Sequence, residues 1–434
     1  MKTLVSAILS IVATAGSWAQ EAGALPTADL AAFLREAEAN SPAIRAAAAR
    51  LTSAQSVPSQ ASTLPDPEVS IAYLNDGVSS FTLGESEFST LSFTWWQELP
   101  HPGKRDQKEE VAAYEAVGAS SDLARVRLEV LAAVKAAYAD LYRFDQTTLV
   151  LSETKSVLEA FAEAARLRYE VGEGIQESVL KAQTEILRLE ADLARVTQDR
   201  RAAEVRLNAA AGRAADTPIG SASLLPAAEL PLDEEGLADR AVARSPAIAA
   251  LRAAVLREEA AVRLAKLNLK PDFLWSASYQ NRGGLDPMVM GSFGLRLPIF
   301  RDRNQRQAVA QSEADLLAVT HQQVESEIQA RASVRELIAR FRRADRLRTL
   351  FGEGVIPQAR SALESAQSAY GVGRLGFLDL LNDLAVVLSA RIELVSQEAD
   401  RLQALAALEP LVVEQLIQVQ GRDEGQGGGN AVND

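Results

Sequence analysis

The stretch YEVGEGIQESVLKAQ, Tyr169–Gln183, returns 201 residues later as YGVGRLGFLDLLNDL, Tyr370–Leu384. The second copy also spells G-x-G-x-x-G between Gly371 and Gly376, which is the fingerprint of a dinucleotide-binding loop. That fingerprint needs a strand before it, whereas ARSALESAQSAY, which leads into the second copy, has a helical pattern. The first copy also lacks the third glycine. The pair therefore indicates a turn between helices that the chain uses twice.

Three further matches occur in the same order in the two halves of the chain, at offsets of 204, 206 and 198 residues. They are Ser41–Ile44 with Ser245–Ile248, Asp66 and Tyr73 with Asp272 and Tyr279, and Leu99–Pro100 with Leu297–Pro298. Four matches at nearly constant spacing predict a duplicated unit of about 200 residues.

The chain begins with a segment typical of secretion. Lys2 precedes an apolar stretch, Leu4–Gly16, and small residues at Ser17 and Ala19 fit a cleavage site after Ala19. An anchor helix is the alternative, but the apolar stretch is too short to span a membrane. We therefore expect a signal peptide at 1–19 and an exported protein, and the composition of 421–434 predicts a disordered tail.

Composition excludes several classes of function. A formal charge of −13 disfavours a nucleic-acid partner, and the absence of cysteine excludes disulfides, thiolate metal sites and a lipid-modified N-terminal cysteine. The two histidines, His101 and His321, are far apart, so a histidine zinc site is not expected, and His101 is interpreted as a junction residue. No constellation of acid, base and nucleophile indicates an enzyme, and neither a cofactor nor a bound metal is expected.

Each half repeats one order of elements: an opening helix, a pair of strands and a long helical hairpin. The expected first repeat is 20–211, with a helix over about 28–57 stopped by Pro58, Pro65 and Pro67, strands within 66–99 and a hairpin over 104–211. The second is 236–420, with a helix over about 235–269, strands within 272–299 joined by a loop at 281–287, and a hairpin over 301–420 interrupted at 351–357. Residues 212–235, rich in proline and glycine, form an expected linker.

The strands alternate apolar and polar residues, and nearly half of the aromatic residues lie in these regions. A soluble antiparallel sheet is one interpretation, but strands of about ten residues with aromatic ends are also typical of a transmembrane barrel, which we favour in an exported protein. The expected membrane-interface aromatics are Trp95, Trp96, Trp275 and Tyr279. Adjacent Trp95 and Trp96 must point to opposite sides of their strand.

The long helix over Lys104–Tyr169 would reach about 100 Å, and two shorter helices end to end would match that length on the way back. Four strands cannot close a barrel in lipid, so several copies must combine their strands. The predicted fold is mainly α with a small β part: duplicated helical hairpins in an oligomeric tube, joined to four barrel strands per chain.

The duplicated plan, the strand pairs, ELPHPGKRDQ at 98–107 and the paired Tyr-x-Val-Gly turns resemble the TolC-type outer membrane efflux family. The resemblance implies a homotrimer with a 12-stranded barrel in the outer membrane lipid and a long periplasmic helical tunnel. It also implies docking to a periplasmic adaptor and an inner-membrane pump, for which we expect the RND type. The HPGKR stretch is similar to the heavy-metal and cation efflux branch.

In that family the tip turns contact the adaptor, which places this role on Gly172, Glu173 and Gly174 and on Gly373, Arg374 and Leu375. Residues after the second turn narrow the pore: Asp379 matches a pore-facing acid, the next such acid falls on Asn382 with Asp383 beside it, and Tyr370 matches a tyrosine of the closed state. The arginine partner of that tyrosine falls on Leu375, one place after Arg374. The acid of the first turn falls on Ser178, beside Glu177. Asp379 has an alternative interpretation as a solvated first-turn acid.

Three functions remain open from the sequence. The first is the outer membrane channel of a tripartite efflux system. The second is the same channel in type I protein secretion. A soluble periplasmic coiled-coil adaptor or scaffold is the alternative of another class.

Overall fold

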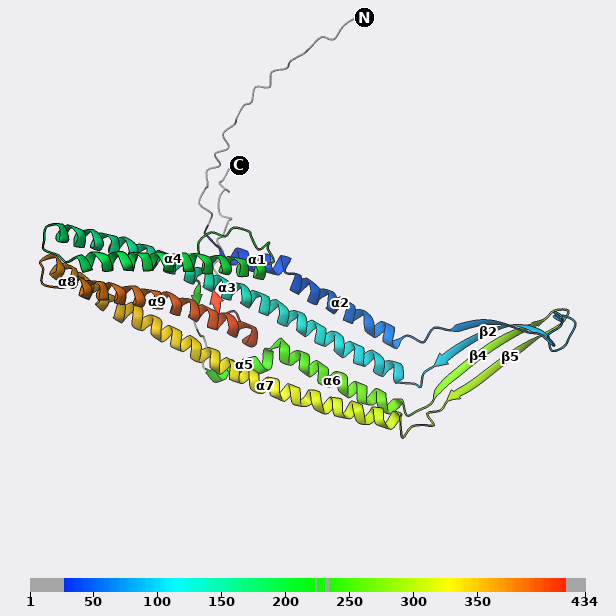
Figure 1. Cartoon of the computed structure of the whole chain (residues 1–434). Coiled ribbons are helices and arrows are strands. Elements are labelled where there is room, and N and C mark those ends of the chain that lie inside the picture. The colour runs from blue at the N-terminus through cyan, green and yellow to red at the C-terminus, as the bar shows by residue number, and fades with distance from the viewer. Residues whose placement is uncertain (1–26, 223–224, 229, 231–233, 419–434) are drawn as a thin grey trace, which may run out of the picture.

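The computed structural model describes residues 27–222, 225–228, 230 and 234–418, so the predicted signal peptide and tail lie outside the described residues. The molecule is elongated, with a sheet at one end and two helical turns at the other (Figure 1). The helices are α1 (Leu30–Asn40), α2 (Pro42–Ser62), α3 (Lys104–Glu170), α4 (Gln176–Ala211), α5 (Glu234–Arg244), α6 (Pro246–Leu267), α7 (Gln305–Thr349), α8 (Ile356–Gly371) and α9 (Phe377–Val412). The strands are β1 (Glu68–Leu74), β2 (Thr90–Leu99), β3 (Ala227–Ala228), β4 (Asp272–Arg282), β5 (Leu285–Arg296) and β6 (Ile417–Gln418).

The 67-residue helix α3 is the long axis of the molecule. It contains no proline, and Gly118 is its one glycine, so nothing in its interior interrupts the hydrogen bonds. Helices α2 and α6 lie along its half near the sheet, and α4 and α9 lie along the half near the turns (Figure 1). At a rise of about 1.5 Å per residue, the 67 residues of α3 correspond to about 100 Å.

Each opening helix is two helices rather than one. The Ser-Pro-Ala-Ile repeat marks the break, because Pro42 and Pro246 stand at the first position of α2 and α6 and cannot donate a backbone hydrogen bond. Of the three prolines expected to stop the first helix, Pro58 does not: it lies inside α2, which continues to Ser62 and ends before Pro65 and Pro67.

The expected interruption at 351–357 is a π-helix over Leu350–Val355, and Pro357 lies at the start of α8. The chain direction is kept, so α7, the π-helix and α8 act as one interrupted rod beside α9. Single-turn π-helices of this kind commonly mark functional sites. The matching part of α3 is regular, so the two hairpins differ here.

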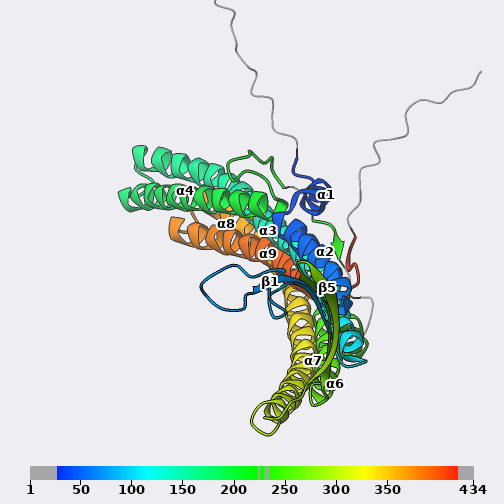
Figure 2. The same cartoon turned by 90° about the vertical axis from the view of Figure 1, so that its right-hand side faces the viewer.

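The four long strands form one antiparallel sheet in the order β1-β2-β4-β5, and Figure 2 views the molecule from the end at which this sheet lies. The connection between β4 and β5 is a tight turn at Gly283–Gly284, with Gly283 at φ +70°, rather than the expected loop over 281–287. Residue Gly84 of the β1–β2 loop lies against this turn, so closely that a Cβ on Gly283 would be 2.4 Å from the Gly84 Cα. Glycine at both positions is therefore required by this contact.

The middle of the molecule is held by buried polar contacts as well as by apolar side chains. Lys135 of α3 pairs with Glu409 of α9, and both side chains are more than nine-tenths buried. Glu409 also accepts hydrogen bonds from the backbone N–H groups of Leu416 and Ile417, each at 2.9 Å. The C-terminal β6 then pairs with β3, which fixes the segment between the two halves to the helices.

Within the described ranges, no helix combines the length and the hydropathy that crossing a bilayer requires.

Candidate functional site

The two turns at the end far from the sheet have the same backbone geometry. Gly172 and Gly373 adopt φ values of +78° and +74°, and the next residue, Glu173 or Arg374, donates its N–H to the carbonyl five positions earlier, at 2.9 Å in both turns. This is a glycine-terminated helix end. The repeated Tyr-x-Val-Gly motif therefore encodes two equivalent turns.

Only one glycine in each turn is left-handed. Gly174 has no positive φ, but an added Cβ would lie 3.0 Å from the backbone nitrogen of Tyr169. A Cβ added at Gly376 would lie 3.3 Å from a carboxylate oxygen of Asp379. The turns were expected to use left-handed glycines at Gly172, Gly174, Gly373 and Gly376, but Gly174 and Gly376 have no positive φ, and at Gly174 the close backbone is what leaves little room for a side chain.

A contact between the two turns was not expected from the sequence. The Arg168 guanidinium, from the end of α3, donates to the Tyr370 carbonyl at 2.5 Å, and its carbon lies 5.0 Å from the centre of the Tyr370 ring. The Tyr370 ring also lies 5.7 Å from the ring of Phe377 at the start of α9. The arginine that contacts Tyr370 is therefore Arg168, whereas the family resemblance had placed an arginine partner at Leu375, next to Arg374.

The candidate pore residues follow the second turn directly. Asp379 and Asn382 are exposed on α9, one helical turn apart, and Asp383 is half-buried. Among the described side chains, no cation lies within ion-pair distance of Asp379 or Asp383. In the first turn, Glu177 pairs with Lys181 at 2.6 Å, and Ser178 is half-buried. Of the acids that follow the two turns at the start of α4 and α9, Glu177 is therefore paired and Asp379 is not, while Glu173 within the first turn has no ion pair among the described residues either.

An apolar cluster fixes these polar groups at the tip of the molecule. It joins the ends of α3 and α4 to those of α8 and α9, and includes Ala165, Leu363, Phe377, Leu380 and Leu384. Since Phe377 and Leu380 are buried on either side of Asp379, the carboxylate must point away from the cluster. The apolar period of α9 thus determines where the acid lies.

At the other end, the sheet has one apolar and one polar face. Strand register places these residues on the apolar face: Val69, Ile71, Phe93, Trp95, Trp275, Tyr279 and Phe293. The opposite face is richer in hydroxyl groups and carries Ser70, Ser92, Thr94, Ser276, Ser278 and Ser292, together with the apolar Leu74, Trp96, Leu274, Met288 and Met290. The Trp95 and Trp275 rings meet edge to face at 4.9 Å, while Thr94 donates to Ser278 at 3.0 Å on the polar side. Trp95 and Trp96 lie on opposite faces, as their adjacency requires.

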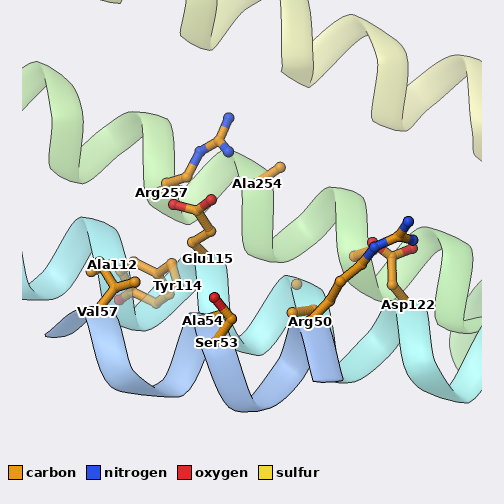
Figure 3. A pocket seen from close by; sticks show the side chains of 13 residues that line it. Arg50, Ser53, Ala54, Val57, Ala112, Tyr114, Glu115, Asp122, Ala254 and Arg257 are labelled. Carbon is orange, nitrogen blue, oxygen red and sulfur yellow. The ribbon is translucent and has the colours of Figure 1, made fainter. Parts of the chain in front are cut away.

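A groove of about 450 Å³ lies between α2, α3 and α6 (Figure 3). Small side chains form its floor, including Ala54, Ala112 and Ala254, and allow the three helices to approach. The Glu115 carboxylate lies beside the stem of Arg257 (Figure 3), and the Arg257 guanidinium pairs with Glu258. Over the described part of the chain, no group of three His, Asp or Glu side chains is arranged to hold a metal ion.

The sequence matches the outer membrane efflux protein family over residues 33–213 and 237–412, leaving out the segment between α4 and α5. The chain belongs to this family. Outer membrane efflux proteins are trimeric channels that work with an adaptor and an inner-membrane pump. The chain is accordingly an outer membrane channel of tripartite efflux with a long periplasmic extension, and not a soluble adaptor or scaffold.

Individual members of the outer membrane efflux family are similar to this chain. The cobalt-zinc-cadmium resistance protein CzcC of Cupriavidus metallidurans is 25% identical over 389 residues, which cover 85% of this chain and 86% of that protein. The outer membrane protein VceC from Vibrio cholerae superposes with a TM-score of 0.75 at 20% identity, over 88% of this chain and 95% of that one. CusC superposes with a TM-score of 0.77 at 13% sequence identity, over 89% of this chain and 92% of that one.

Proposed function

We propose that three copies of the chain form a passive exit duct whose narrowest point is built by the residues after the second turn. Tyr370, Asp379, Asn382 and Asp383 are the proposed gate residues. In this arrangement three Asp379 carboxylates, one from each copy, would face a common axis and favour cations over anions.

The observation that carries this proposal is the difference between the two equivalent turns. Glu177 of the first turn is neutralised by Lys181 at 2.6 Å, whereas Asp379 of the second is exposed and has no cationic partner among the described side chains. A carboxylate that is left uncompensated can act on passing ions. Asn382 carries no charge, so the negative potential acting on passing ions would come mainly from Asp379, with a smaller contribution from the half-buried Asp383.

We also propose roles for the remaining predicted residues. The turn residues Gly172, Glu173 and Gly174, with Gly373, Arg374 and Leu375, are the proposed contacts to the periplasmic adaptor. Trp95, Trp275 and Tyr279 would lie at the membrane interface on the apolar face, with Trp96 on the lumen face. Heavy-metal cations as cargo are proposed from the similarity to the cobalt-zinc-cadmium resistance protein CzcC, and an RND-type inner-membrane pump is proposed from the family resemblance alone.

The test is the purified, detergent-extracted protein in a planar bilayer. The proposal predicts particles of three chains, a stable ion conductance and a reversal potential that favours cations in a salt gradient. A conductance without ion preference would contradict the proposed acidic constriction, and the absence of conductance would contradict the duct itself.

A further inference from the structure

The junction between β5 and α7 exposes apolar side chains directly beside unpaired cations. Leu297, Ile299 and Phe300 are exposed by 58%, 75% and 72%. Arg301 and Arg303 follow them in the chain, and both are exposed without an ion pair to any described residue. A group of exposed apolar side chains marks an interaction surface, so this junction is arranged to meet a partner.

The backbone holds the two cations in a defined turn. The Phe300 carbonyl accepts from the N–H of Arg303 at 3.1 Å, and the Arg301 carbonyl accepts from the N–H of Arg306 at 2.8 Å. Asp302, the acid between the two cations, pairs instead with Arg306 at 2.7 Å. The positive charges of Arg301 and Arg303 are therefore not balanced within the turn.

The equivalent junction of the first half meets its partner inside the chain. There the His101 N–H and the Lys104 ammonium both donate to the Asp272 carboxylate at 2.8 Å. At the offset of 198 residues, LPHPGKR of the first half gives way to LPIFRDR of the second. Exposed apolar side chains and a further cation thus stand where the first half has an internal lock.

The apolar residues of the junction continue the apolar face of the sheet. Phe293 of β5 lies on this face opposite Trp275. Side chains two residues apart in a strand share a face, so Leu295 follows Phe293, and Leu297 comes next at the end of the strand. A neighbouring copy beside β5 would lie in the plane of the sheet, whereas these side chains stand perpendicular to that plane. The apolar surface therefore stays free on the outside.

The height of the junction fits the boundary of a membrane. It lies where the sheet ends and the helices begin (Figure 1), and the helices of this outer membrane channel extend into the periplasm. Arginine side chains at such a boundary reach toward the lipid headgroups while apolar neighbours stay in the hydrocarbon. A guanidinium group also matches the geometry of phosphate oxygens.

We propose that the segment Leu297–Arg303 binds an anionic phospholipid of the periplasmic leaflet. Arg301 and Arg303 hold its phosphate, and its acyl chains lie against the apolar side chains of the same segment. Two cations without a nearby free carboxylate favour an anionic headgroup over a zwitterionic one, whose ammonium group they would repel. The inference rests on the membrane-spanning sheet proposed above.

A carboxylate from a neighbouring copy is the competing partner. Asp66, the repeat equivalent of Asp272, is exposed and has no ion pair within the described chain. One carboxylate would leave a charge of Arg301 and Arg303 unbalanced, and it would not cover the apolar side chains beside them. A phospholipid supplies both the anion and the apolar cover.

Lipid retention by the full-length protein tests the site. The protein is reconstituted in vesicles of phosphatidylcholine and phosphatidylglycerol in equal parts and re-extracted in mild detergent, and native mass spectrometry counts the retained lipids. The test variant is Arg301→Gln/Arg303→Gln, and Arg301→Lys/Arg303→Lys keeps the charge. The matched control, Arg105→Gln/Lys108→Gln, removes the cations at the corresponding positions of the first junction. Native mass and bilayer conductance are recorded for each protein.

We expect wild type to retain phosphatidylglycerol in preference to phosphatidylcholine. The double glutamine variant should retain about tenfold less of it, because two charge-assisted contacts are lost. The lysine variant and the first-junction control should retain most of it. Equal retention by wild type and the glutamine variant, or an equal loss in the control, overturns the lipid site and, with conductance intact, leaves the channel function standing.

Two further results separate the remaining possibilities. A glutamine variant that dissociates into single chains, while its remaining trimers retain lipid as wild type does, assigns the two arginines to the neighbouring copy and overturns the lipid site. Wild-type protein that shows no conductance contradicts the proposed duct, and with it the membrane placement on which the site depends.

Discussion

Arg168 and Tyr370, 202 residues apart in the chain, join the two turns at the tip of each protomer. The guanidinium of Arg168 donates to the Tyr370 carbonyl and lies over the Tyr370 ring. The first turn would otherwise contact the second mainly through apolar side chains. One cation therefore couples the hairpin that carries Asp379 to the other hairpin of the same chain.

Replacing Arg168 should loosen the tip. A hydrogen bond from a charged group contributes about 1.5–3 kcal/mol and an exposed cation–π contact about 0.5–1 kcal/mol. Because Arg168 is half-buried, we expect Arg168→Ala to raise the fraction of time in the high-conductance state by about tenfold. Single-channel recording measures this fraction. The matched control is Arg166→Ala, since the ion pairs of Arg166 within the described residues are with Glu163 and Glu170 of its own helix. Equal effects of the two variants would contradict a link between the turns.

The hydroxyl of Tyr370 should not be needed for this link. Arg168 binds the backbone carbonyl and the face of the ring, and both remain in Tyr370→Phe. Tyr370→Ala removes the ring and its contact with Phe377, so it should resemble Arg168→Ala. The same recordings compare the variants. A phenylalanine variant as open as the alanine variant would show that the hydroxyl, and not the ring, holds the tip.

The buried pair in the middle of the molecule should dominate stability. Glu409→Gln leaves the Lys135 ammonium buried without a counter-charge, and we expect a loss of about 3–5 kcal/mol in the free energy of unfolding. Adding Lys135→Met removes that charge and should recover part of the loss. Chemical denaturation of the purified protein measures both. The control Glu185→Gln breaks an exposed pair with Arg188 and should cost at most about 1 kcal/mol. If Glu409→Gln lowered the free energy of unfolding as little as the control does, the role of the Lys135–Glu409 pair would be contradicted.

Mild acid should weaken the contact between α1 and the segment after α4. The hydrogen bond from Arg213 lowers the pKa of Glu36 below its ordinary value of 4.5, against the opposing effect of burial. A lowered folded-state pKa stabilises the fold above the unfolded pKa, and this contribution is lost as the pH falls through the folded value. The thermal midpoint of wild type should therefore fall more between pH 7 and about pH 3.5 than that of Glu36→Gln.

The control for this comparison is Glu109→Gln, since Glu109 is exposed and has no ion pair within the described residues. The thermal midpoint of Glu109→Gln should fall as far as that of wild type over the same pH range. Identical pH dependence in Glu36→Gln and wild type would contradict the assignment.

Repetition and alternation made most of the architecture predictable. The strand pairs, the long helix α3 and the two turns are local patterns, and the duplication doubled each signal. The break at Ser41–Pro42 was misread because the alanine-rich pattern continues across it. Pro58 was misread because α2 continues past it, although proline has no N–H to donate and ordinarily interrupts a helix.

The contacts of the candidate site were less predictable. Arg168 lies in a run of ordinary surface residues, and only the packing of two hairpins brings it to Tyr370. Lys135 and Glu409 are polar residues in helical patterns, and no local signal distinguishes them from solvated ones. The repeat could not reveal the Arg168 contact either, because the residue of the second half that is equivalent to Arg168 is Ala369, which has no charged side chain.

The central claim is that an acidic constriction after the second turn controls a cation-preferring outer membrane channel. The most direct measurement is the reversal potential of single channels in a salt gradient for wild type, Asp379→Asn and the matched control Glu177→Gln. The account predicts that Asp379→Asn lowers the cation preference several-fold while Glu177→Gln, whose carboxylate is already paired with Lys181, leaves it unchanged. An Asp379→Asn channel with wild-type selectivity and conductance would contradict the claim.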